Sequence, residues 1–249
     1  MFRIIVPALC LLAGTASAKD LKVLTGAGMS MPVKALAADF GTRTGDTVTV
    51  VSDTAGGVQK RMEAGEKFDL VIGTEAVMDT LAKDGKITGQ RDRLAQMVAG
   101  IGARAGSPKP AIADAEETKA TLLAARNITY VDPAAGGITG VFFLSQVDKL
   151  GIGEQVRAKA VLKPNGTGVA AAVASGEAQY GVTLVSEMLP NKGVKVWPLP
   201  DALQMTTIYA AALSSDAQNA MDAKSLLDDL RGQRGRDESL KAGLKPVTN

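Results

Sequence analysis

Four times along this 249-residue chain, a short β-branched or apolar run leads into a glycine-containing turn and then into a helical pattern. The turns are Gly26–Ser30, Ser52–Gly57, Asp132–Gly140 and Lys163–Gly168. Strands that alternate with helices are typical of βαβ units and of a mainly parallel sheet. We therefore predict an α/β fold. The chain is long enough for two lobes, each a mainly parallel sheet flanked by helices.

The first 18 residues show the three parts of a secretory signal peptide in the right order. Arg3 gives a charged start, Ile4–Ala13 an apolar run, and Ala16–Ala18 a small-residue cleavage site. The apolar run is shorter than the roughly 18 to 20 residues that a membrane span needs. We predict that residues 1–18 are removed and that the mature protein is periplasmic. A buried N-terminal helix is the alternative interpretation.

Composition excludes several kinds of function. Cys10 lies in the predicted leader and the chain has no histidine, which removes Ser-His-Asp and Cys-His chemistry and any ordinary zinc site. Without Arg3, 27 basic residues face 26 acidic ones, and the basic residues are dispersed, which argues against a nucleic-acid partner. The glycine turns match neither the P-loop nor the full dinucleotide-binding pattern. We expect no cofactor and no metal.

The composition changes near Gly102, where Ala103–Pro108 has the character of a segment that crosses between lobes. We assign residues 19–102 together with 205–249 to lobe 1 and residues 103–204 to lobe 2. The β-rich stretch Leu203–Leu213 would return the chain to lobe 1, and the final helices would pack there.

The four turns lie where strands meet helix N-termini. Unpaired backbone N–H groups and the helix dipole hold a small anion at such a position without a charged side chain. Hydroxyls at Ser30, Thr54, Thr139 and Thr167 would add donors or cap the helices. An ordinary βα turn explains any one of these loops, but four such loops on two lobes favour a ligand cleft between the lobes.

The sequence also resembles a known family. Leu21–Phe40, Met62–Gly65 with Phe68–Ile72, Asp132-Pro133 followed by Gly140, and Asn165–Ala178 are similar to the periplasmic molybdate-binding proteins of ABC importers. The resemblance covers nearly the whole mature chain. It implies a type II solute-binding protein that closes over a small anion, such as molybdate or tungstate, and delivers it to an ABC permease. Such a carrier is expected to be a monomer and not an enzyme.

Matching the loops to the family pattern implies the ligand-binding positions. They are Gly28, Met29, Ser30, Thr54, Ala55, Gly56, Thr139, Gly166, Thr167, Thr183 and Leu184. The chain departs from the family pattern at two positions. Gly28 stands where the family usually has a serine hydroxyl, and Leu184 stands at the position that often leads to a ligand-binding tyrosine. Each missing donor leaves a buried oxyanion under-satisfied by about 1 to 3 kcal/mol. A small organic carboxylate is therefore the alternative ligand.

An enzyme or a secreted sensor on the same scaffold is the competing class of function. Carboxylates stand near strand ends at Asp53, Asp69, Asp132 and Glu187, but helix caps or lobe-bracing hydrogen bonds explain them, and their spacing selects no catalytic pair. Arg104 could place a charge at the lobe boundary, but a solvated or structural arginine is the commoner explanation.

Overall fold

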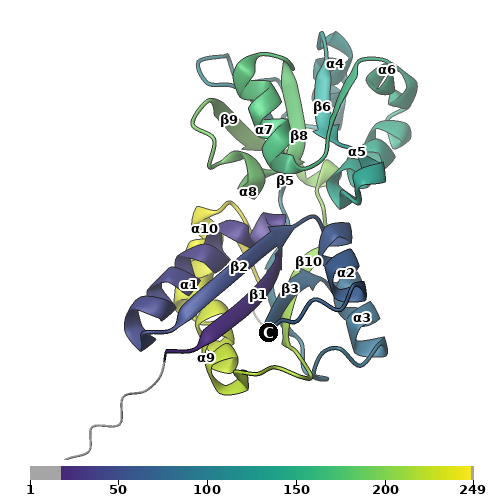
Figure 1. Ribbon diagram of the computed structural model, residues 1–249. Helices are drawn as coiled ribbons and strands as arrows, with labels where there is room; N and C mark the ends of the chain where they lie inside the picture. The colour runs from purple at the N-terminus through teal and green to yellow at the C-terminus, as the bar shows by residue number, and fades with distance from the viewer. Residues whose placement is uncertain (1–17, 248–249) are drawn as a thin grey trace, which may run out of the picture.

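The computed structural model describes residues 18–247. Two sheets stand one above the other, each with helices on both faces, and they form two lobes (Figure 1). The predicted two-lobed α/β fold is confirmed. The sheets are mixed rather than mainly parallel, because each contains antiparallel pairs beside its parallel ones. Apart from Ala18, the predicted signal peptide lies outside the described residues.

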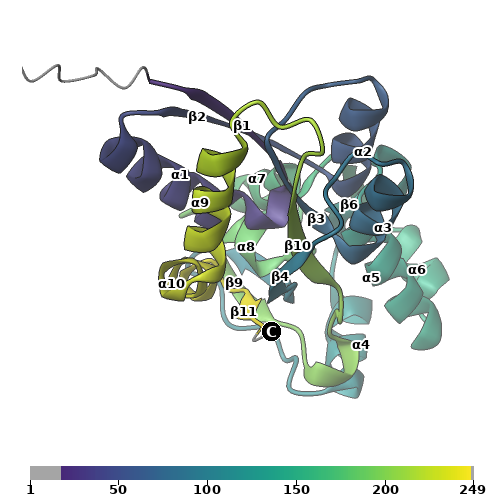
Figure 2. The ribbon, with the colours of Figure 1, turned by 90° about the horizontal axis from the view of Figure 1, so that it is seen from below.

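The lower sheet of Figure 1 has the strand order β11-β4-β10-β3-β1-β2. Its strands are β1 (Asp20–Gly26), β2 (Thr47–Asp53), β3 (Leu70–Thr74), β4 (Asp92–Gln96), β10 (Ile208–Leu213) and β11 (Lys245–Pro246). Figure 2 shows one face covered by α1 (Ser30–Thr44), α9 (Ala220–Arg231) and α10 (Gln233–Lys241), and the other by α2 (Ala55–Glu63) and α3 (Glu75–Lys83). The C-terminal helices therefore pack on lobe 1, as predicted.

The upper sheet has the order β7-β6-β8-β5-β9. Its strands are β5 (Ala99–Arg104), β6 (Ile128–Val131), β7 (Ala160–Lys163), β8 (Tyr180–Leu184) and β9 (Val194–Pro198). One side carries α4 (Ala115–Ala124), α5 (Ile138–Lys149) and α6 (Gly153–Arg157), and the other α7 (Gly166–Ser175) and α8 (Val185–Met188). The short α8 lies on the side of this lobe that faces lobe 1.

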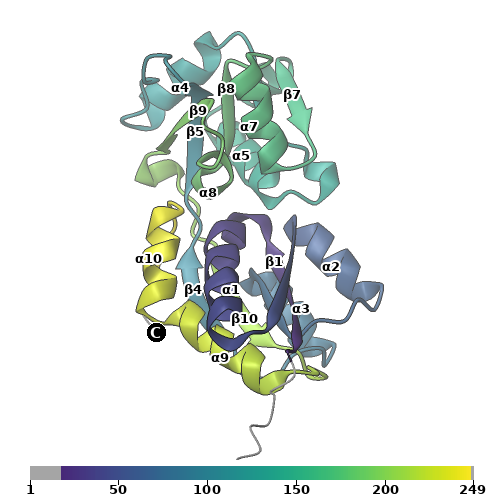
Figure 3. The same ribbon diagram turned by 60° about the vertical axis from the view of Figure 1, so that its left-hand side comes forward.

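The chain crosses between the sheets twice. Figure 3 shows β4 continuing upward into β5, and the second crossing joins β9 to β10. Gln204 ties the two crossings together: the Ala99 N–H donates to its Oε1 at 2.9 Å, and its Nε2 donates to the Ala99 carbonyl at 2.9 Å. The Met97 N–H donates to the Thr207 carbonyl at 2.9 Å. These bonds make the two crossings one hinge.

The predicted lobe boundary after residue 102 falls inside β5, which belongs to the upper sheet. The first crossing is earlier, between Gln96 and Ala99. Gly102, at the predicted boundary, and its neighbour Gly100 both lie in β5, where close packing explains the glycines. A Cβ at Gly100 would lie 2.7 Å from Val185 Cγ2, and one at Gly102 would lie 2.6 Å from Met188 Sδ. On the return path only Ile208–Leu213 of the predicted Leu203–Leu213 stretch forms a strand.

Local signals place several helix N-termini at the facing edges of the two sheets. Thr54 caps α2 by accepting the Gly57 N–H at 3.0 Å, and Asn165 caps α7 by accepting the Gly168 N–H at 2.8 Å. Gly137 precedes α5. Because parallel strands end at the same sheet edge, the helices that follow them begin there together.

Across residues 18–247, the structure contains no helix with the length and apolar character that crossing a membrane requires.

Asp69 joins two segments within lobe 1, at a place remote from the lobe interface. Its side chain is 5% exposed, and it accepts the Lys22 N–H at 2.9 Å and the Asn219 N–H at 3.0 Å. The carboxylate thus joins β1 to the start of α9, which confirms the lobe-bracing interpretation for this residue.

Asp69→Ala is expected to lower the free energy of unfolding by about 3 kcal/mol, because two backbone N–H groups lose a charged acceptor. Urea denaturation followed by circular dichroism measures this change. Asp79→Ala is the matched control, since the Asp79 side chain is 69% exposed and pairs with the surface Arg91. This substitution should cost less than about 0.5 kcal/mol. Equal effects of the two substitutions would contradict the bracing role.

Candidate functional site

The helix N-termini enclose a small cavity of about 20 Å³ between the lobes. Eleven residues from both lobes line it: Ala27, Thr54, Ala55, Val131, Gly137, Ile138, Thr139, Gly166, Leu184, Glu187 and Tyr209. Backbone at the start of α2, α5 and α7 contributes to this lining, so N–H groups and helix dipoles face the cavity. The arrangement suits a small ligand with anionic or hydrogen-bond-accepting groups.

The lobes touch through backbone beside this cavity. The Gly56 N–H on lobe 1 donates to the Gly136 carbonyl on lobe 2 at 3.3 Å, and the Thr54 hydroxyl lies 3.5 Å from the Ala135 carbonyl. A Cβ at Gly56 would lie 3.0 Å from Gly136 Cα. Gly136 has a φ of +77°, a conformation that favours glycine. The two glycines therefore permit a direct backbone contact across the cleft.

Glu187 places a carboxyl group in the cavity wall. Thr183 donates its hydroxyl to Glu187 Oε2 and lies 3.3 Å from the Thr139 hydroxyl, so the three side chains form one network on lobe 2. The carboxyl also packs against the first residue of α7, where a Cβ on Gly166 would lie 2.1 Å from Glu187 Oε2. Burial raises the pKa of Glu187 above its ordinary value, and hydrogen bonds from Thr183 and the Leu184 backbone oppose this rise.

Tyr209 is the lobe 1 counterpart of this network. It is 4% exposed, and its hydroxyl accepts the Gly28 N–H at 3.2 Å. Burial, and second the nearby Glu187 carboxyl, raise the pKa of Tyr209 well above its ordinary value, so the phenol keeps its proton. Two titratable side chains, one from each lobe, thus meet in the cavity wall.

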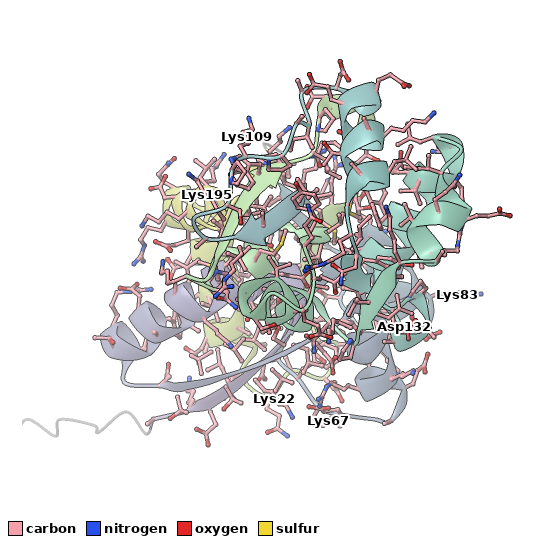
Figure 4. All side chains as sticks on the ribbon, turned by 90° about the horizontal axis from the view of Figure 1, so that it is seen from above. Lys22, Lys67, Lys83, Lys109, Asp132 and Lys195 are labelled. Carbon is pink, nitrogen blue, oxygen red and sulfur yellow. The ribbon has the colours of Figure 1, made fainter. Side chains whose placement is uncertain are left out.

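Basic side chains do not enter this wall: among the described residues that line the cavity, none is lysine or arginine. Figure 4 shows Lys22, Lys67, Lys83, Lys109 and Lys195 around the edge of the molecule. Within residues 18–247, no three histidine, cysteine, aspartate or glutamate side chains come together as metal ligands would. An anion held here would depend on backbone N–H groups and hydroxyls.

The structure brings some of the predicted site residues together. Thr54, Ala55, Thr139, Gly166 and Leu184 line the cavity. Gly28, Gly56 and Thr183 lie directly behind this lining through the contacts given above.

Three predicted residues lie elsewhere. Met29 is 1% exposed and belongs to the apolar core. Ser30 is half-buried in the first turn of α1 and is not part of the cavity lining. Thr167 is exposed in the first turn of α7 and is not part of the cavity lining. Thr54 and Thr139 therefore remain as the hydroxyls that face each other across the cleft, while Ser30 and Thr167 do not join them.

Sequence reasoning did not place six lining residues at the site: Ala27, Val131, Gly137, Ile138, Glu187 and Tyr209. Glu187 had a signal, since it follows β8 closely among the carboxylates near strand ends. Tyr209 had none, because it reaches the cavity only after the chain returns through the hinge and β10 pairs with β3.

The other singled-out charged residues lie outside the cavity lining, and two of them have structural partners. Asp53 pairs with Arg61 at 2.9 Å and accepts the Thr54 N–H at 2.8 Å. Asp132, labelled in Figure 4, accepts the Ala134 N–H at 2.9 Å. Arg104 is exposed at the end of β5 farthest from the hinge, so it supplies no charge to the cleft.

Two α/β lobes joined by a double crossing, with helix N-termini around an interlobe cavity, are the fold of type II periplasmic solute-binding proteins. The chain belongs to the family described as bacterial extracellular solute-binding proteins, whose model matches residues 21–245. This match confirms the resemblance at the level of the family.

Individual relatives differ in what their names say they bind. Aconitate isomerase from a Pseudomonas species is 29% identical over 236 residues, which cover 91% of this chain and 88% of that protein. The periplasmic molybdate-binding protein of Azotobacter vinelandii has a similar fold, with a TM-score of 0.72 at 20% identity over 92% of this chain and 99% of that one. The substrate-binding domain of a putative molybdenum ABC transporter from Clostridium difficile gives 0.69 at 18% identity, over 93% and 100%.

Gly56→Ala tests the backbone contact between the lobes. The new methyl group would crowd Gly136 in the closed arrangement of this structure, so the ligand-free variant should populate more open arrangements and have a larger radius of gyration than the wild type. The fold should keep its stability, since alanine suits the first turn of α2 better than glycine does. Small-angle X-ray scattering and thermal melting measure the two effects. Gly89→Ala, with no atom within 4 Å of its added Cβ, is the control.

Glu187→Gln tests the environment of the buried carboxyl. Below the ordinary carboxyl pKa of 4.5, Glu187 is protonated in both folded and unfolded chains. As the pH rises, the unfolded carboxyl ionises first because the folded pKa is raised. The wild type should therefore lose stability relative to Glu187→Gln as the pH climbs from about 4.5 through the folded pKa. Melting temperatures of both proteins across this range measure the change, and a pH-independent difference would contradict it.

Proposed function

We propose that this protein captures a small organic carboxylate in the interlobe cleft and delivers it to an ABC permease. Capture and delivery follow from the family, since solute-binding proteins work by closing around a small ligand. The choice of an organic acid over a molybdate-like oxyanion depends on the chemistry of the cavity wall.

The observation that carries the proposal is the Glu187 carboxyl in a wall whose described residues include no basic side chain. A divalent oxyanion next to an ionised carboxylate is repelled, and neutralising the carboxylate costs free energy as well. An organic acid can share one proton with Glu187, so that a carboxyl and a carboxylate face each other through a hydrogen bond. Its carbon skeleton would contact the apolar side chains of Val131, Ile138 and Leu184.

The relative named aconitate isomerase supports the same ligand class. It aligns with almost the whole chain, and its name refers to an unsaturated organic acid with several carboxyl groups. We therefore use aconitate as the first probe of this cleft. The molybdate-like ligand implied by the sequence resemblance is the competing proposal.

Binding of an organic acid requires the lobes to be farther apart than in this structure. The cavity of about 20 Å³ is far smaller than the several hundred Å³ typical of organic-ligand sites. The hinge formed by the two crossings supplies the necessary rotation. The ligand then stabilises the partly closed form only by contacting both lobes.

A thermal-shift screen of the mature chain tests the ligand class. The probes are cis-aconitate, trans-aconitate, smaller dicarboxylates, molybdate, tungstate and sulfate. Ligand at about 100 times its dissociation constant adds about 2.7 kcal/mol of stability, so a bound acid should raise the melting temperature by several degrees. A rise with molybdate or tungstate and none with any organic acid would overturn the proposal.

Isomerisation of the bound acid is a second candidate function, favoured by the name of that relative together with Glu187. In its ionised form, the Glu187 carboxylate would take a proton from the methylene carbon beside a carbon–carbon double bond. The electron pair would move into the allyl system, and Glu187 would return the proton to the far carbon. The double bond shifts without oxidation or reduction. A raised carboxyl pKa suits this exchange.

Proton NMR of cis-aconitate with the mature protein in D₂O tests this activity. An isomerase would form trans-aconitate and incorporate solvent deuterium, and Glu187→Gln should slow both at least about a hundredfold. Glu177→Gln is the matched control, because that carboxylate pairs with Lys163 outside the cavity lining. Binding without turnover in the wild type would leave capture as the function and exclude isomerisation of this acid.

A further inference from the structure

The Tyr209 side chain fills the space beside the cavity that a side chain at position 28 would need. A Cβ at Gly28 would lie 2.4 Å from the Tyr209 hydroxyl oxygen and 2.4 Å from Leu184 Cδ1. A Cβ at Gly26 would lie 2.8 Å from Tyr209 Cε1. Any side chain at position 28 would therefore collide with the phenol. Glycine occurs here because Tyr209, which is 181 residues farther along the chain, fills the space.

The Tyr209 hydroxyl acts as a hydrogen-bond acceptor, and its own proton remains available to donate. It accepts the Gly28 N–H at 3.2 Å, and within residues 18–247 it donates to no protein acceptor. The side chain is 4% exposed and lines the cavity. A buried phenol retains its proton, and a donor in such a place needs an acceptor. None of the described residues accepts this proton, and a ligand oxygen in the cavity would supply the acceptor.

We infer that Tyr209 is a specificity-determining residue whose hydroxyl donates a hydrogen bond from lobe 1 to a carboxylate oxygen of the ligand, in the place where a side chain at position 28 would otherwise stand. The inference rests on the proposed function, since it assumes an organic acid in this cleft. It assigns the lobe 1 side of the site to a residue of β10 rather than to the first loop.

This placement links ligand contact to the hinge. Tyr209 is the second residue of β10, directly after the crossing from β9, and its neighbours in the sheet are Thr74 and Ala95. The ladder shifts register between Tyr209 and Ala210. The phenol is thus held by strands on both sides and by the Gly28 N–H. A ligand that bonds to Tyr209 as well as to lobe 2 donors spans the cleft and favours closure.

Calorimetric titration of trans-aconitate into the mature protein and its Tyr209→Phe variant tests the inference. Loss of a hydrogen bond to a charged group should raise the dissociation constant at least about tenfold. Tyr180→Phe is the matched control, because Tyr180 stands at the opposite end of β8 from the cavity residue Leu184. It should bind as the wild type does.

Fluorine NMR gives a readout that does not depend on how the Tyr209→Phe variant folds. The chain has three tyrosines, so wild-type protein labelled with 3-fluorotyrosine yields three resonances, which Tyr130→Phe and Tyr180→Phe assign by elimination. We expect trans-aconitate to move the Tyr209 resonance more than the other two.

Two results would overturn the inference alone: wild-type affinity in Tyr209→Phe, or an unmoved Tyr209 resonance while the wild type binds the acid. Failure of the wild type to bind any organic acid of the panel would overturn the proposed function, and the inference with it. The two failures are therefore distinguishable in one set of titrations.

Discussion

The pairing of the two hinge crossings is the constraint on which the rest of the structure depends. Gln204 satisfies both backbone groups of Ala99, and it belongs to the return crossing while Ala99 begins β5. The apolar core continues through this region, because Met97, Ala99 and Met205 belong to one buried cluster that reaches both lobes. The centre of the hinge is therefore buried among apolar side chains and held by the Gln204 hydrogen bonds. Lobe motion is confined to bending about these strands, so the same loops meet whenever the lobes close.

The sequence predicted what local chemistry controls. Turns that follow β-branched runs, with a capping hydroxyl such as that of Thr54, located strand ends and helix starts. Long-range packing was not accessible. Gly102 was placed at the lobe boundary because nothing in its sequence neighbourhood reveals that Met188 will pack against it. Tyr209 was missed for the same reason, since its role arises from a strand that joins the sheet late.

The candidate site combines two kinds of recognition that the sequence suggested separately. Helix N-termini supply fixed backbone donors, which stabilise negative charge without a basic residue. Glu187 and Tyr209 add a carboxyl group and a phenol from opposite lobes, and burial raises the pKa of both groups. With such a cavity wall, ligand affinity depends on the protonation state of the ligand. With a wall of serine hydroxyls, it depends mainly on the ligand's size and charge. The departures from the molybdate-binding pattern at Gly28 and Leu184 fit this difference.

The contact between Gly56 and Gly136 has an evolutionary consequence. Because the lobes meet through main-chain atoms at this point, the geometry of closure does not depend on any side chain there. Residues that face the ligand can then be exchanged one at a time, by mutation or by design, while the protein keeps the same docked shape. A receptor that recognises the closed form would continue to accept it. Ligand preference and downstream recognition are thus free to change independently, which is a physical route by which one scaffold acquires many cargoes.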